Sequence, residues 1–120
     1  MRERIRKELL SPESGFFDLK QDVGGIVDIE FLVQYLVLLN SWKYRELLKW
    51  TDIVWLLETL NETGIINGYI AHILKVGYLT YRATVHQHNL QEKPAKVSEN
   101  RFCGLRKNVK DIWKNIMKAV

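Results

Sequence analysis

Apolar residues recur at helical spacing through most of this 120-residue chain, and this recurrence limits the fold more than any other feature. No stretch alternates apolar and polar residues between hairpin turns, as half-buried strands do. The length suits one domain with one hydrophobic core. We therefore predict an all-α fold, a helical bundle of four to five helices around one core. Residues 1–23 would form a lead-in helix and an extended segment, and residues 24–120 the bundle.

The clearest helix is predicted over residues 51–63. Thr51 is a suitable N-cap, and Trp50 and Trp55 have the spacing of a hydrophobic staple across the start of the helix. Gly64 is a suitable residue to end it. These signals define both ends of one helix.

Three further helices follow from the same spacing. Residues 26–40 are apolar on nearly every side, which predicts the central and most buried helix. Asn67 can cap a helix that reaches about residue 90. Within it Gly77 costs about 1 kcal/mol relative to Ala, which indicates close packing against a neighbour. After a loop over residues 91–97, Ser98 would open the last helix.

Cysteine usage and the absence of targeting signals indicate the compartment. Cys103 is the only cysteine, so an internal disulfide is excluded, and we expect it to be a small buried apolar residue. The first residues are charged and lead into no signal sequence. The longest apolar stretch is too short and too charged to span a bilayer. We expect a cytoplasmic protein that does not contact a membrane.

The net charge of +4 is concentrated at the end of the chain. Residues 98–120 hold six basic and two acidic residues, so the preceding residues are balanced. Four lysines share one face of the predicted last helix, which indicates a solvated face or a surface for an acidic partner. No nucleic-acid motif accompanies them, and we predict no binding to DNA or RNA. The four are Lys107, Lys110, Lys114 and Lys118.

Asp28 and Glu30 are two carboxylates close enough in sequence to be considered as a metal-binding pair. On a helix, residues i and i+2 point roughly 200° apart, so the two cannot readily hold one metal ion. Asp28 lies in the first turn, where a carboxylate can accept from exposed N–H groups. The preceding Gly24 and Gly25 could expose N–H groups to a phosphate, with Lys20 nearby, but tight turns use the same residues. We favour structural roles for all of them.

The histidines do not form a metal site on this reading. His86 and His88 point apart on one helix, His72 is nearly four turns away, and none has a cysteine partner. An ordinary polar contact between Arg82 and His86 explains their shared face. No catalytic set of side chains can be assembled, so we predict no catalytic residue and no metal site.

The run FDLKQDVGGIVDIEFLVQYLVL, residues 17–38, is much more specific than its parts. It resembles the region that follows the C-terminal nucleotidyltransferase domain in glutamine synthetase adenylyltransferases. Residues 1–6, 48–52 and 81–91 resemble other segments of that region, in the same order. Where this chain has Val27 and Asp28, the amino-terminal half of the family tends to have arginine and glutamate. The resemblance is thus to the adenylylating, C-terminal half.

The resemblance implies a helical part of a larger enzyme. One half of that enzyme transfers AMP from ATP to a tyrosine of glutamine synthetase, with Mg²⁺, and the other removes it by phosphorolysis. PII signal proteins and glutamine regulate it. The family's catalytic Asp-x-Asp strand is absent from this chain, which implies that the chain binds neither ATP nor Mg²⁺ and is inactive alone. Its partners would be the nucleotidyltransferase domain, glutamine synthetase and PII.

Eight residues match the family's motifs, with roles that the resemblance does not assign. Two alternatives stay open: the related helical domain of PII uridylyltransferases, and a free-standing module that binds an acidic partner through the last helix. The motif residues are Lys20, Gly24, Gly25, Asp28, Glu30, Gln34, Arg82 and His86.

Overall fold

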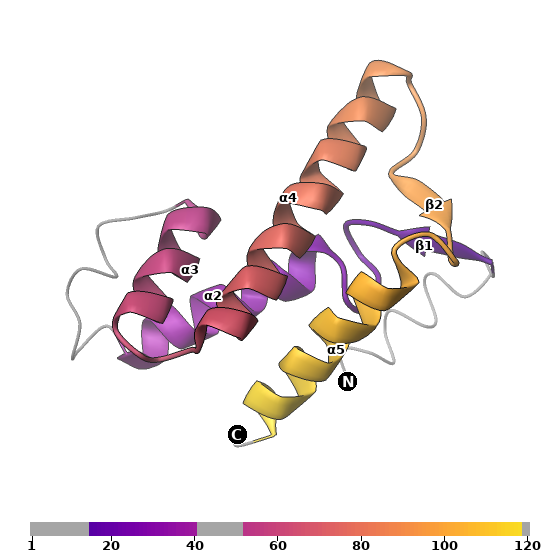
Figure 1. Ribbon diagram of the computed structural model, residues 1–120. Helices are drawn as coiled ribbons and strands as arrows, with labels where there is room; N and C mark the ends of the chain where they lie inside the picture. The colour runs from indigo at the N-terminus through magenta and orange to yellow at the C-terminus, as the bar shows by residue number, and fades with distance from the viewer. Residues whose placement is uncertain (1–14, 41–51, 119–120) are drawn as a thin grey trace.

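The fold is organised around one long helix, α4 (Gly68–Leu90), which contacts the three other described helices (Figure 1). The computed structural model describes residues 15–40 and 52–118. These residues form four helices and one small sheet, which confirms the all-α prediction for the described part of the chain. The predicted helix within residues 1–23 lies outside the described residues. The elements are β1 (Phe16–Asp18), α2 (Ile26–Asn40), α3 (Ile53–Glu62), α4 (Gly68–Leu90), β2 (Lys96–Ser98) and α5 (Cys103–Met117).

Helix α2 has more buried residues than any other described helix, as predicted. Its buried side chains lie toward α3, α4 and α5, and Ile29, Leu32 and Val33 are fully enclosed. The burial does not extend to every side, because Phe31 and Leu38 are exposed although both are apolar. A uniformly apolar sequence therefore identified the central helix without showing which of its sides faces the core.

Helix α3 starts one residue later than predicted. The N-cap is Asp52, whose Oδ1 accepts from the N–H groups of Val54 at 2.8 Å and Trp55 at 3.3 Å. Thr51 and Trp50, the predicted cap and staple residue, lie outside the described residues. The predicted end is confirmed, because Gly64 follows the C-cap with a φ of +80°, a conformation that favours glycine.

Gly77 is where α4 meets two helices at once. The predicted cap is confirmed, since the Asn67 side chain accepts from the N–H of Ile70 at 2.8 Å. A Cβ on Gly77 would lie 3.3 Å from Cδ1 of Ile29 in α2 and 3.3 Å from Cγ2 of Val109 in α5. The predicted close packing at Gly77 is therefore confirmed, and the contact is with two helices.

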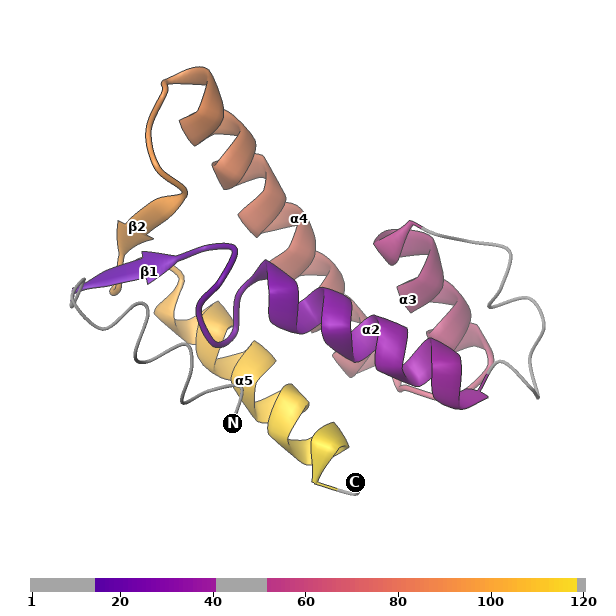
Figure 2. The same cartoon turned by 180° about the vertical axis from the view of Figure 1, so that it is seen from behind.

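The two short strands were not predicted as a sheet. β1 pairs antiparallel with β2, with Phe17 opposite Val97, and this pairing joins the start of the described chain to the segment between α4 and α5 (Figure 2). Three-residue strands are too short to show an alternating pattern. Ser98 therefore belongs to β2, and the prediction that it opens the last helix is wrong. α5 begins at Cys103, which is exposed and not buried as expected.

An aromatic column joins the sheet to α4 and α5. Tyr81 is fully buried, with its ring edge-to-face against Phe17 at 5.5 Å and Phe102 at 5.9 Å between ring centroids. Its hydroxyl has no hydrogen-bond partner among the described residues. Burial raises the pKa of Tyr81 well above the usual value for tyrosine, and the nearby Arg106 opposes that rise.

Replacing Gly77 by Leu is expected to lower the free energy of unfolding by about 1–3 kcal/mol, because the added side chain would overlap Ile29 and Val109. Urea unfolding followed by circular dichroism measures the change. Gly104→Leu is the matched control, since a Cβ there meets nothing within 4 Å. It should leave stability unchanged or raise it by up to about 1 kcal/mol. Equal losses in both variants would contradict the crossing at Gly77.

Replacing Tyr81 by Phe is expected to flatten the loss of stability at high pH. Burial raises the pKa of Tyr81 in the folded state, whereas the unfolded residue ionises at about pH 10. The contribution of Tyr81 to the free energy of unfolding is therefore fully present below that pH and is lost as the pH rises further. Thermal unfolding from pH 8 to 11 should show a smaller decline for Tyr81→Phe than for the parent chain. Tyr69→Phe, at an exposed residue, should keep the parent's slope. A Tyr81→Phe curve parallel to that of the parent would refute this assignment.

Candidate functional site

The segment before α2 is an internally hydrogen-bonded loop, residues 18–25, that we name the cap loop. The Asp18 carboxylate accepts from the N–H groups of Lys20 at 3.0 Å and Gln21 at 3.1 Å. The Asp22 carboxylate accepts from the Asp18 N–H at 2.8 Å, and the Asp22 N–H donates to the Asp18 carbonyl at 3.1 Å. Two aspartates thus fold the loop onto itself.

The N–H groups of residues 24–27, at the start of α2, are used inside the protein. This agrees with the structural interpretation of the glycine pair and argues against a phosphate cradle, which needs N–H groups directed outward. Asp28, in the first turn of α2, accepts from the N–H of Gly24, two residues before the helix begins. The bonds are Gly24 N–H to Asp28 Oδ2 at 2.8 Å, Gly25 N–H to the Asp22 carbonyl at 2.9 Å, Ile26 N–H to the Leu19 carbonyl at 2.8 Å and Val27 N–H to the Lys20 carbonyl at 3.1 Å.

Both glycines of the cap loop are required by space. Gly24 has a φ of +84°, and a Cβ there would lie 2.8 Å from Cγ and 2.9 Å from the carbonyl oxygen of Arg106. A Cβ on Gly25 would lie 2.6 Å from the carbonyl oxygen of Leu19, which is fixed backbone. Larger residues would therefore push the loop away from both α2 and α5.

Arg106 of α5 binds the cap loop and holds it against α5. Its Nε donates to the Val23 carbonyl at 2.8 Å, and its guanidinium lies 4.3 Å from the centroid of the Phe17 ring. In the sequence, Arg106 is only one of six basic residues near the end of the chain. No local signal identifies it, because its partners are more than eighty residues away.

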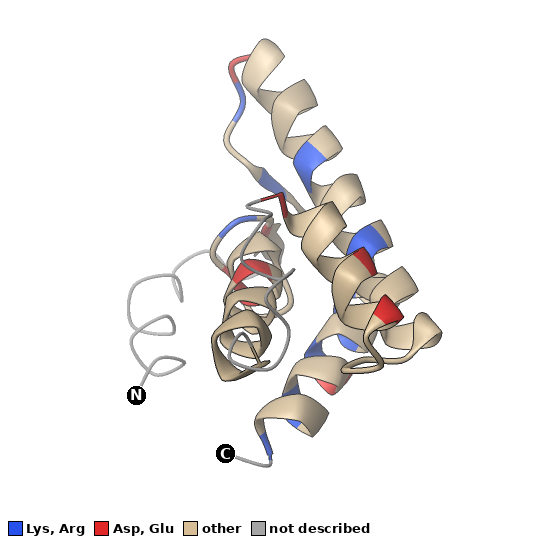
Figure 3. Ribbon diagram, turned by 90° about the vertical axis from the view of Figure 1, so that its left-hand side faces the viewer, with Lys and Arg blue, Asp and Glu red and all other residues tan. Residues whose placement is uncertain are grey.

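The cap loop leaves one charged side chain in solvent. Lys20 and its neighbour Gln21 are exposed, whereas Gly24, Gly25 and Asp28 are buried. The loop can therefore offer a cation to a partner while its backbone stays closed. Basic residues also recur along α5 (Figure 3).

A second polar cluster forms where α2, α3 and α4 meet, around Tyr78. Burial raises the pKa of Tyr78, Arg82 lowers it, and the carboxylates of Glu30 and Asp52 raise it further. The Arg82 guanidinium lies 5.9 Å from the centroid of the Tyr78 ring. Glu30 and Arg82, from two separate sequence motifs, thus both act electrostatically on the same phenol.

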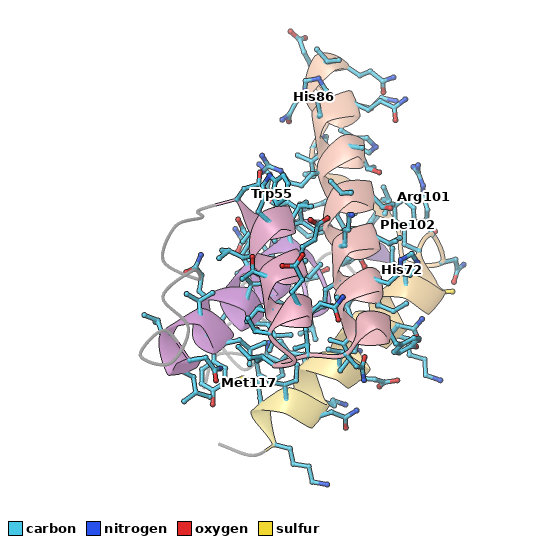
Figure 4. All side chains as sticks on the ribbon, turned by 60° about the vertical axis from the view of Figure 1, so that its left-hand side comes forward. Trp55, His72, His86, Arg101, Phe102 and Met117 are labelled. Atoms are coloured by element: carbon cyan, nitrogen blue, oxygen red, sulfur yellow. The ribbon has the colours of Figure 1, made fainter. Side chains whose placement is uncertain are left out.

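The remaining motif residues stand apart from both clusters. Gln34 is exposed on α2, and His86 is exposed near the end of α4, with His72 near its start (Figure 4). His88 lies 2.8 Å, through Nδ1, from the Pro94 carbonyl oxygen. Within residues 15–40 and 52–118, no group of three His, Cys, Asp or Glu side chains could hold a metal ion.

Comparison with known proteins identifies the source of these motifs. No established family profile matches the chain. A bifunctional glutamine synthetase adenylyltransferase/adenylyl-removing enzyme of Methylococcus capsulatus is 44% identical over 119 residues, which is 99% of this chain and 13% of that protein. The chain is homologous to a part of the glutamine synthetase adenylyltransferases. It therefore corresponds to a small piece of the adenylyltransferase, and the resemblance inferred from residues 17–38 is confirmed.

The adenylyltransferase motif residues have three kinds of surroundings in the structure. Four lie in or next to the cap loop, two lie beside Tyr78, and two are exposed on α2 and α4. The groups are Lys20, Gly24, Gly25 and Asp28; Glu30 and Arg82; and Gln34 and His86.

No helix within the described ranges is long and apolar enough to cross a membrane.

Replacing Asp28 by Ala is expected to lower the free energy of unfolding by at least about 1–3 kcal/mol, because the buried Gly24 N–H loses its acceptor. Asp28→Asn retains a side-chain oxygen that can accept the same bond and should cost less. Asp111→Ala, at an exposed position of α5, is the control and should change stability by less than about 0.5 kcal/mol. Chemical denaturation distinguishes the three, and equal effects would contradict the capping role.

Proposed function

We propose that this chain is the helical domain that follows the C-terminal nucleotidyltransferase domain of a glutamine synthetase adenylyltransferase. The observation that carries the proposal is the 44% identity over nearly the whole chain. The complete enzyme would be a multifunctional cytoplasmic protein of nitrogen regulation. It would transfer AMP from ATP to a tyrosine of glutamine synthetase and would respond to PII signal proteins.

In this proposal the chain supports catalysis and does not perform it. The described residues offer no three-ligand group for Mg²⁺, and the N–H groups of residues 24–27 are occupied. Mg²⁺, and through it the phosphates of ATP, would be held by carboxylates in the rest of the polypeptide. The domain's part is to present a rigid surface to the nucleotidyltransferase domain.

Lys20 is the residue of the cap loop best placed for that contact. Its backbone is fixed at both ends, since its N–H donates to Asp18 and its carbonyl accepts from Val27, while its side chain is exposed. A cation on a fixed backbone loses less entropy when it pairs with an anion than one on a mobile loop. We infer that Lys20 contacts an acidic group of the catalytic domain, its bound nucleotide or glutamine synthetase.

Charge reversal at Lys20 tests this role in the full-length enzyme. Lys20→Glu should lower kcat/KM for adenylylation of glutamine synthetase at least tenfold and leave the melting temperature unchanged, because the turn's bonds to residue 20 are made by its backbone. Lys93→Glu, an equal charge change at another exposed loop residue, is the control and should retain activity. Gly25→Val should lower activity together with stability.

Full activity of Lys20→Glu would refute the contact at the cap loop. A full-length protein that transfers no AMP to glutamine synthetase, although folded and supplied with ATP and Mg²⁺, would refute the proposed function itself. Adenylylation is measured by incorporation of labelled AMP into glutamine synthetase.

A further inference from the structure

Helix α4 carries a second apolar stripe on the side away from the core. Its members follow alternating steps of three and four residues along the whole helix, and all of them are exposed. The large ones are strongly so, with Tyr69 at 63%, Leu79 at 48% and Leu90 at 73%. We name this set the outer stripe: Tyr69, His72, Val76, Leu79, Ala83, His86 and Leu90.

The spacing of the outer stripe is that of a helix–helix seam. Steps of three and four residues keep side chains on one side of a helix, as at the a and d positions of coiled coils. The inner side of α4 is already used, because Leu74, Gly77 and Tyr81 are buried against the rest of the domain. The outer stripe therefore lies on the side of α4 opposite its buried residues.

The stripe is long enough for a whole partner helix. From Tyr69 to Leu90 it extends over about 32 Å at the helical rise per residue. The C-terminal half of α4 also projects beyond α2, α3 and α5 in both ribbon views (Figures 1 and 2). A helix lying along this half would therefore not collide with those three.

Charge specifies what kind of helix would fit. α4 contains no Asp or Glu among its 23 residues. Lys75 and Arg82 each lie one residue before a stripe residue, seven apart, and so form a basic edge along the seam. Lys75 pairs with Glu58 of α3 at 3.0 Å, so the positive charge that this edge offers to a partner comes mainly from Arg82. Flanking positions of this kind form salt bridges between coiled-coil helices.

A second copy of the chain fits this edge poorly. In an antiparallel pair, the edges bearing Lys75 and Arg82 would face each other with like charges. In a parallel pair they would face the opposite edge, which holds Ile73, Thr80 and Gln87 and has no charge to offer. A partner with acidic residues is favoured over either arrangement.

We propose that the outer stripe docks an amphipathic helix from another part of the same longer polypeptide, with acidic residues beside its apolar seam. The inference rests on the proposed function for the existence of that polypeptide. The homologous adenylyltransferase supports it, since this chain spans only 13% of its length and the remainder could supply the helix. The outer stripe is then an interface between domains, with His86 in its seam and Arg82 on its edge.

Site-specific photo-crosslinking in the full-length protein tests the proposal. We would place p-benzoylphenylalanine at Ala83, in the seam, and at Asn115, an exposed residue of α5, as the control. Irradiation of the Ala83 variant should give an intramolecular crosslink to one segment. Mass spectrometry should show that this segment has apolar residues at steps of three and four with Asp or Glu beside them.

Two further variants test the chemistry of the seam. Leu79→Lys and Arg82→Glu should each reduce the yield of that crosslink at least fivefold, because one inserts a charge into the apolar seam and the other repels the acidic helix. Asn115→Lys should leave the yield unchanged. Leu79 and Arg82 are both exposed on the surface of α4, so circular dichroism should show an intact domain for each variant.

Three outcomes would overturn the proposal: a crosslinked product of twice the molecular mass, a crosslink to a different protein, and a yield at Ala83 no higher than that at Asn115. Crosslinking needs neither ATP nor glutamine synthetase. Its failure is therefore distinguishable from failure of the proposed function, which the transfer of AMP measures.

Discussion

The close approach of three helices at Gly77 is the constraint on which the rest of the structure depends. A side chain there would meet Ile29 of α2 and Val109 of α5, each at 3.3 Å from the Cβ position. Because α4 can pass this near both helices, Tyr81, one turn further on, is enclosed between Phe17 and Phe102. The sheet and the start of α5 are thereby held against the same core.

The cap loop uses that arrangement to close the start of α2. Arg106 reaches the loop only because α5 lies against α4, and it then binds the Val23 carbonyl while covering the Phe17 ring. The N–H groups of Gly24 and of the next three residues are satisfied within the domain. These four donors are not available to a phosphate, so the exposed chemistry of the cap loop comes from side chains such as Lys20.

How much the sequence could predict depended on the range of the interactions involved. Most signals within one helix were reliable: the Asn67 cap, the end at Gly64 and the close packing at Gly77 were confirmed, although the N-cap of α3 is Asp52 and not the predicted Thr51. The start of α5 was predicted wrongly because Ser98 is fixed by pairing with β1, a contact across most of the chain. The Arg106 contacts and the cluster of Glu30 and Arg82 around Tyr78 depend on the same kind of long-range contact, which no local pattern records. How residues 1–120 divide into a lead-in and a bundle stays a prediction.

The distribution of the motif residues links these observations to the domain's surroundings. Gly24, Gly25 and Asp28 are explained by the fold alone, because space and hydrogen bonding require them. Gln34 and His86 are not, since both are exposed and no described contact that stabilises the domain needs them. Exposed residues of this kind point to binding more than to packing. His86 also lies in the outer stripe, and exposed apolar surfaces of this kind mark sites of interaction. We infer that α4 packs against the core on one side and forms an interface on the other.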